Sequence, residues 1–435
     1  MMSQRVYFEW NTLEDEFSWR RLLAKEKLEP TSTLSPASQS ADRWLLLHLI
    51  RGIALLFIAL IAITGTAASP TELENIRLGN EIQTVLRTEE QAKRTGDQVL
   101  LNQLIDSQST GGWRRVWRSI PPVTEQDAQQ GPVMTLVQAK SMDNLVMAEV
   151  LVEQPAYGWS QFSPYKELRF YRKTNSGWLR TVPDDTFWGG HHVVESDLLR
   201  FEFRNRDAQL VQANVEHLDQ IYASLHQMLG LELASTSEKH TFVLTPEMVN
   251  ETGNLTTRNA IVSPLLSQMP QNTSIEAYFL QTVVTRMTYL TVNRRISEGY
   301  SLNQRGGSSY RWRNMQIGLR RWLRIELLSV VPPWDQMAVK AFEAQLAVHL
   351  PMTLRDVSEE DLDLLTDRDY RYWHSGAAIS LIDYMVDTYS EEVLPRLVRG
   401  LQSDKRWQEL IPYITGRSVT EFETEWNQYL AQKVP

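Results

Sequence analysis

The 435-residue sequence contains no cysteine. This absence excludes disulfide bonds, zinc sites built from thiolates and cysteine nucleophiles, and it suits any compartment, including an extracytoplasmic one that oxidises stray thiols. Histidine is scarce as well: there are eight, and none lies between His240 and His349. No two of them stand four residues apart on a predicted helix, so no single element offers a pair of zinc ligands. A composite metal site assembled by folding stays open, although we expect neither a metal nor a cofactor.

Strong charge of either sign is also missing. The formal net charge is −9, which argues against nucleic acid as the main partner. Hydrophobic residues make up 42% of the chain and charged residues 22%, a composition typical of folded globular proteins. The length predicts about two or three domains.

Long apolar runs are limited to residues 44–68, "WLLLHLIRGIALLFIALIAITGTAA". About 20 residues of this run could cross a bilayer of ~30 Å. Trp44 suits the headgroup region, and Arg51 could extend to the interface. The alternative is a cleaved signal peptide, since small residues follow the run. About 50 residues precede the apolar part, which favours a single transmembrane signal-anchor helix.

Basic residues precede this run and acidic residues follow it, which predicts a cytoplasmic N-terminus and an extracytoplasmic bulk in a single-pass cell-membrane protein. Residues 1–43 are then a cytoplasmic tail ending in a flexible linker, "EPTSTLSPASQSAD". Such a tail could contact a cytosolic partner, or it could be poorly ordered.

Residues 71–198 predict two helices followed by antiparallel strands. An amphipathic helix ends at the turn Thr95-Gly96-Asp97, and a short second helix follows. Turn signals at Asp143-Asn144 and Asn175-Ser176-Gly177 separate apolar runs, which is typical of two hairpins. We find no phosphate-binding loop, nucleophile elbow or carboxylate pair in this region.

The strings "EEQAKRTGDQVLLNQLID" and "RFYRKTNSGWLRTVPDDTFWG" resemble SnoaL-like domains of the nuclear-transport-factor-two superfamily. The resemblance implies an α+β cone with a curved antiparallel sheet, whose pocket is catalytic, binds a ligand or is packed shut. Asp106 is a candidate pocket residue near the end of the second helix. His191 and His192 are expected in a loop after the last strand.

Residues 199–435 predict a strand–helix–strand unit, further short strands and a helical C-terminal half. The segment "IEAYFLQTVVTRMTYLTV", 275–292, predicts a buried helix capped by Thr273 or Ser274. The tail predicts three helices. Gly416 separates the last two, and Ser418 with Glu421 forms a capping-box pattern.

The tail segments "AAISLIDYMVDTYSEEVLPRLVRGL" and "IPYITGRSVTEFETEWNQYL" resemble the peptidase MA-like group of gluzincin metalloproteases. Active members carry His-Glu-x-x-His on one helix and a glutamate ligand on a later one. The resemblance places the first helix at 275–292 and the second around Trp322-Leu323. The corresponding positions carry a degenerate set: Val284, Thr285, Thr288, Ile325 and Glu326. Glu326 is one residue late, a rotation of roughly 100°, and Arg286 would repel a cation.

The expected fold class is therefore α+β: a single transmembrane helix, a cone domain with a curved antiparallel sheet (71–198), and a gluzincin-like domain with a helical C-terminal half (199–435). The expected function is that of a bacterial, membrane-anchored extracytoplasmic protein with an inactive metalloprotease-like domain in a binding or scaffold role. A peptide or protein ligand could bind under a basic, aromatic loop, and the alternative is a plain solvated loop. The candidate residues of this loop are Arg294, Arg295, Tyr310, Arg311 and Trp312. An active hydrolase with a non-standard site is the competing hypothesis.

Overall fold

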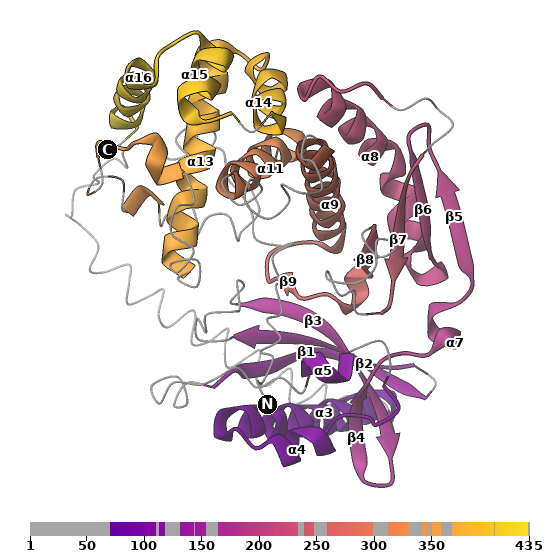
Figure 1. Ribbon diagram of the computed structural model, residues 1–435. Coiled ribbons are helices and arrows are strands. Elements are labelled where there is room, and N and C mark those ends of the chain that lie inside the picture. Colours follow the sequence, from indigo (N-terminus) through magenta and orange to yellow (C-terminus); the bar gives the residue numbers. More distant parts are fainter. Residues whose placement is uncertain are drawn as a thin grey trace, which may run out of the picture.

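The computed structural model shows a mixed fold of helices and two sheets (Figure 1). It describes residues 70–109, 113–117, 131–142, 144–153, 164–233, 239–247, 259–298, 312–329, most of 342–357, 368–403 and 405–433.

The expected fold class needs one correction. Across the described residues, no helix combines the length and the apolar character needed to span a bilayer. The expected membrane span at 44–68 and the tail at 1–43 lie outside the described residues. The described residues show a mixed fold of helices and sheets.

The first part of the chain packs one long helix on an antiparallel sheet with the strand order β1-β2-β3-β4. Asp97 caps the second helix by accepting a hydrogen bond from the Leu100 N–H, and Gly96 adopts a φ of +69° in the turn before it. The predicted helix pair and both hairpins are confirmed. The elements are α3 (Pro70–Thr95), α4 (Gln98–Gln103), α5 (Trp113–Trp117), β1 (Val133–Met142), β2 (Leu145–Glu153), β3 (Tyr165–Thr174) and β4 (Gly177–Thr181).

A second sheet follows, with the order β5-β6-β7-β8. β5 and β6 are antiparallel, whereas β6, β7 and β8 run parallel, with helix α8 as the crossover between β6 and β7. The expected domain boundary between 198 and 199 therefore falls inside a pair of hydrogen-bonded strands. The elements are α7 (Asp185–Trp188), β5 (His191–Glu195), β6 (Leu199–Arg204), α8 (Ala208–Met228), β7 (His240–Thr245) and β8 (Ala260–Val262).

Helices form the C-terminal half and pack in one hydrophobic core with the second sheet. The tail was predicted to hold three helices, but the described residues show four, because the chain breaks at Ser390, which has a φ of +67°. The capping box of Ser418 and Glu421 is confirmed. The helices are α9 (Ile275–Glu298), α11 (Arg313–Leu328), α13 (Arg368–Tyr389), α14 (Val393–Gln402), α15 (Trp407–Thr415) and α16 (Val419–Ala431).

The two parts are joined by more than the chain that links them. Strand β9 (Met269–Pro270) precedes α9 but pairs with β3 of the first sheet. The indole N–H of Trp113 donates to the carbonyl of Pro246 at 2.7 Å. Leu266 lies in the same apolar cluster as Trp113 and Phe170. A segment between β8 and α9 thus completes the packing of the first sheet.

Helices α11 and α13 lie close together at Gly318. A Cβ at this position would lie 2.6 Å from the Ala378 Cβ and 3.0 Å from the Ala378 carbonyl carbon. We expect Gly318→Ala to lower the free energy of unfolding by about 1–3 kcal/mol through overpacking. An exposed helical glycine replaced by alanine would instead gain roughly 1 kcal/mol.

Gly79 on α3 is the matched control, because its Cβ would meet only the Leu136 side chain at 3.8 Å. Urea titration of both variants measures the difference. Equal stabilisation of Gly79→Ala and Gly318→Ala would contradict the close helix approach.

Candidate functional site

A row of polar side chains crosses the buried face of β3. Tyr165, Glu167, Arg169 and Tyr171 alternate along the strand, so they share the face that packs on α3. All four are buried, and Arg169 is only 1% exposed. Ionisable groups are rarely this buried unless they are paired, so the row needs partners from other elements.

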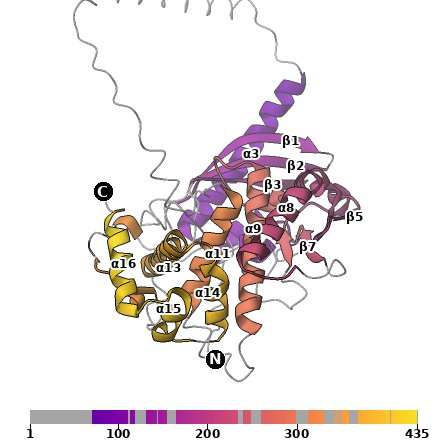
Figure 2. The ribbon, with the colours of Figure 1, turned by 90° about the horizontal axis from the view of Figure 1, so that it is seen from above.

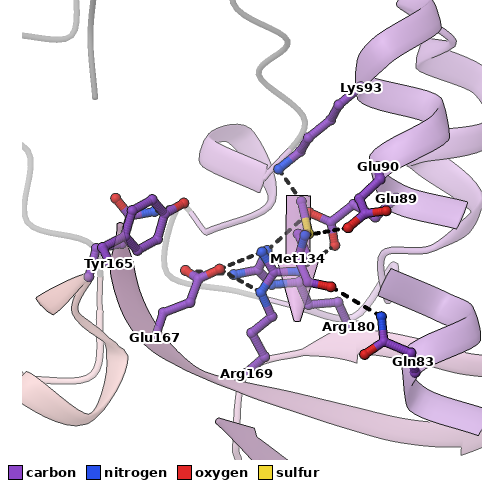
Figure 3. A network of polar contacts seen from close by, with 10 residues as sticks. Gln83, Glu89, Glu90, Lys93, Met134, Tyr165, Glu167, Arg169 and Arg180 are labelled. Atoms are coloured by element: carbon purple, nitrogen blue, oxygen red, sulfur yellow. Dashed lines mark hydrogen bonds and ion pairs between the residues drawn. The ribbon is translucent and has the colours of Figure 1, made fainter. Parts of the chain in front are cut away.

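Those partners come from α3 and β4, as Figure 3 shows. The Arg169 guanidinium donates to Glu89 on α3 at 2.8 Å and to Glu167 at 2.5 Å. Arg180 on β4 lies 3.5 Å from Glu89 and 3.4 Å from Glu167. Lys93, one turn after Glu89 on α3, contacts the Glu89 carboxylate at 2.8 Å. We call these five charged residues the β3 ionic network.

The electrostatics keep the network ionised. Burial opposes the charge on Glu89, but Arg169, Lys93 and Arg180 outweigh it and hold the Glu89 pKa well below its usual value. Burial likewise opposes the charge on Glu167, and Arg169 with Arg180 lowers its pKa. Burial raises the pKa of Tyr165 and of Tyr171 above the usual value. These four groups therefore change charge only far from neutral pH, which suits a structural clamp better than acid–base catalysis.

Asp106, the candidate pocket residue, lies beside this network rather than in an open pocket. Its carboxylate accepts from Arg172 at 2.9 Å and from the Thr181 hydroxyl at 3.0 Å. The Trp117 ring covers the Arg180 guanidinium at 4.5 Å. The other candidates of this region, His191 and His192, lie in strand β5 of the second sheet. Their expected place in a loop is wrong: they pair with Arg204 and Phe203 of β6, whereas Asp106 bonds to residues of the first sheet.

The positions that the gluzincin resemblance assigns to the zinc site lie where α9 and α11 pack together. Val284 and Ile325 are fully buried, and Thr285 and Thr288 are nearly so. The hydroxyl of Thr285 donates to the Gln281 carbonyl at 2.6 Å, and that of Thr288 to the Val284 carbonyl at 3.0 Å. Glu326 is partly exposed.

A cationic side chain occupies the space between these helices. Arg324 on α11 is fully buried, and its guanidinium donates to the Thr285 hydroxyl on α9. Two residues earlier on α11, the Trp322 indole donates to Asp383 on α13 at 2.7 Å. A metal cation at the position of Thr285 would meet a fixed positive charge instead of ligands.

In the part of the chain that the structure describes, no three histidine or acidic side chains are grouped so that they could hold a metal ion. The Tyr222 ring contacts both His226 and His240. Its centre lies 4.5 Å from the centre of the His226 ring and 5.6 Å from that of the His240 ring. His374 contacts the backbone carbonyl of Asp356.

The expected basic loop over a cleft needs correction. Arg294 and Arg295 lie in the last turns of α9, and the Arg294 side chain is exposed. Trp312 is fully buried and packs edge-on against Trp407 at 4.7 Å, so it belongs to the core and not to a ligand surface. Tyr310 and Arg311 lie outside the described residues.

Two buried groups outside the β3 ionic network, Asp207 and His240, have pKa values shifted by burial. Asp207, just before α8, is 1% exposed, and its Oδ1 accepts from the Ser263 hydroxyl at 2.8 Å. Among the described residues no group bonds to its Oδ2, and burial raises the Asp207 pKa to about 6. Burial, together with the charges of Arg294 and His226, lowers the His240 pKa to about 4.

Sequence reasoning missed the β3 ionic network, although the sequence holds a signal for it. In "YKELRFYRKT" the residues Tyr165, Glu167, Arg169 and Tyr171 follow a strand period of two. On α3, Glu89 and Lys93 stand four residues apart, the spacing of a helical ion pair. Read together, these patterns indicate charges that face each other across one layer.

Comparison with known proteins adds no family to this picture. No family model matches the chain, and neither a curated protein nor a solved structure matches it. The likeness to SnoaL-like and peptidase MA-like domains therefore rests on the sequence motifs alone.

Proposed function

We propose that this chain is a non-catalytic binding or scaffold protein, with a metalloprotease-like domain that has lost its metal site. The contact between Arg324 and Thr285 carries the proposal. It fills the space between α9 and α11, where the sequence resemblance puts zinc, with a buried guanidinium. The neighbouring positions, Val284 and Ile325, have side chains that cannot bind a metal.

The first part of the chain supports the same reading. The side chains that face α3 from the centre of its sheet form a closed set of ion pairs with exposed fractions of 8% or less for Glu89, Glu167, Arg169 and Arg180. A small molecule would have to break these pairs to enter, and buried charges left without a partner are costly. We therefore expect ligands on the outer surface, which suits a peptide or a folded protein.

Zinc analysis of the purified full chain tests the proposal. After incubation with excess zinc and gel filtration, we expect far less than one zinc per chain, and no zinc-dependent cleavage of a mixed peptide library. One tightly held zinc per chain, with peptide cleavage that disappears on Glu326→Ala or His349→Ala, would instead establish the competing hydrolase hypothesis.

A gain-of-function variant checks whether the zinc positions are correctly placed. The change V284H/T288H/I325E/R324L puts two histidines four residues apart on α9 and a carboxylate on α11, and removes the cation. We expect this variant to hold about one zinc per chain. The control variant V284H/T285H/I325E/R324L directs its histidines about 100° apart on the helix and should not bind zinc. Circular dichroism shows whether each variant is folded.

A further inference from the structure

Three of the four outer strands in the described residues have edge groups that bond to other elements. Along β1, Gln83 on α3 accepts from the Leu136 N–H at 2.9 Å and donates to the Met134 carbonyl at 3.1 Å. Glu90 accepts from the Met134 N–H. These side chains of α3 thus take the place of a neighbouring strand.

The outer strands β4 and β8 are closed in other ways. The backbone N–H of Arg180 on β4 donates to the Leu104 carbonyl at 2.8 Å, and the Arg180 carbonyl accepts from the backbone N–H of Asp106 at 2.9 Å. On β8, the Ala260 carbonyl accepts from the Arg286 guanidinium at 3.1 Å.

The fourth edge, β5, is open. The Gly190 carbonyl accepts from the backbone N–H of Asn205, and the Ser196 N–H donates to the Leu199 carbonyl. These two bonds flank the strand, so its even-numbered residues are the ones whose backbone groups bond to β6. The N–H and C=O groups of His191, Val193 and Glu195 must then point away from the sheet. In the part of the chain that the structure describes, no hydrogen bond reaches these outward backbone groups. Both views place β5 at the outer margin of the molecule (Figures 1 and 2).

We propose that β5 pairs with β5 of a second copy of this chain, antiparallel and with the twofold axis through Val193. The sequence "HHVVE" is self-complementary in this register. Val193 faces Val193 of the second copy, and His191 faces Glu195 of the second copy at both ends. All three outward residues take part in hydrogen-bonded pairs, giving about six backbone hydrogen bonds across the axis. The two valines, each 50% exposed, cover each other.

The sequence of β5 suits the antiparallel register better than a parallel one. A parallel partner of the same sequence would place Glu195, which pairs with Arg200 and Lys239 in its own chain, beside Glu195 of the second copy, and like charges directly opposite are unfavourable. The antiparallel pair satisfies both open edges at once, so assembly stops at a dimer. A contact of one short strand buries less than the ~1,200 Å² of a standard stable interface, so we expect dimer formation to depend on concentration.

Sedimentation velocity of the full chain over a hundredfold concentration range tests the pairing. We expect the dimer fraction to rise with concentration in the wild type and to be lost in Val193→Pro, which removes an outward N–H. Val193→Thr keeps the N–H and should dimerise like the wild type. A wild type that stays monomeric over the whole range, or equal dimerisation of Val193→Pro, overturns the proposal.

Cysteine cross-linking gives a second test that does not depend on the proline variant folding. The chain has no cysteine, so Val193→Cys and Val133→Cys each introduce a single thiol, at valines that are both 50% exposed on edge strands. Paired residues on the axis lie about 5.5 Å apart, within disulfide reach. We expect mild oxidation to link Val193→Cys at least tenfold faster than Val133→Cys. Equal rates in the two variants would contradict the β5 dimer.

Discussion

Replacing Arg169 by methionine should lower the free energy of unfolding by about 3–5 kcal/mol. The change leaves Glu167 with only the longer contact to Arg180, and Glu89 with Arg180 and Lys93. The two buried carboxylates then lack one of their cations, and an undercompensated buried charge is among the largest single penalties in folded proteins. Methionine keeps the volume of the side chain, so the loss reports the charge and not a cavity. Urea unfolding followed by circular dichroism measures it.

Lys166→Met is the matched control, because Lys166 lies on the same strand and also pairs with a glutamate. Its contact with Glu149 is 3.7 Å long and both side chains are about one-third exposed, so the cost should be at most ~1 kcal/mol. Similar small losses in both variants would show that the β3 ionic network does not hold the first sheet to α3.

Asp207 should make the protein less stable as the pH rises through 6. Its pKa is about 6 in the folded chain, against an ordinary value of 3.8. A raised folded pKa means that the stabilising contribution is complete below the ordinary value and is lost above the folded one. A difference of about two pKa units corresponds to ~3 kcal/mol. We expect the wild type to lose this amount relative to Asp207→Asn between pH 4 and pH 7.

His240 supplies the opposite slope and serves as the internal control. Its pKa is about 4 in the folded chain, below the ordinary 6.5, so its contribution is complete above 6.5 and is lost as the pH falls towards 4. Relative to His240→Gln, the wild type should therefore lose ~3 kcal/mol on acidification over that window. Urea titrations at several pH values give both differences. If the difference in free energy of unfolding between the wild type and either variant does not change with pH, the corresponding residue does not have the shifted pKa described here.

The sequence predicted the structure correctly at turns and helix caps, where residues close together in the chain determine the local conformation. Asp97 after Gly96, Gly177 in the β3–β4 hairpin, and Ser418 with Glu421 each satisfy nearby backbone groups, so the residues themselves are enough. The break at Ser390 was missed, because a serine with positive φ gives no such signal.

Long-range contacts explain the rest of what the sequence did not predict. Arg169 reads as a solvated strand residue until Glu89, 80 positions earlier, is placed opposite it. Trp312 reads as part of a basic loop until Trp407 packs against it. Strand β9 is too short to show a period, and its pairing with β3 depends on the two parts meeting.

The closure of β1 by helix side chains has a consequence for exchange and aggregation. Because the Met134 and Leu136 amides are bonded to α3 and not to a strand, their hydrogen exchange reports the detachment of the helix while the sheet stays intact. Each such opening would bare a ten-residue strand with Val133 and Val137 already exposed on it. Helix α3 therefore covers part of this edge, and we expect its local unfolding to be the step that exposes β1 to intermolecular β-pairing.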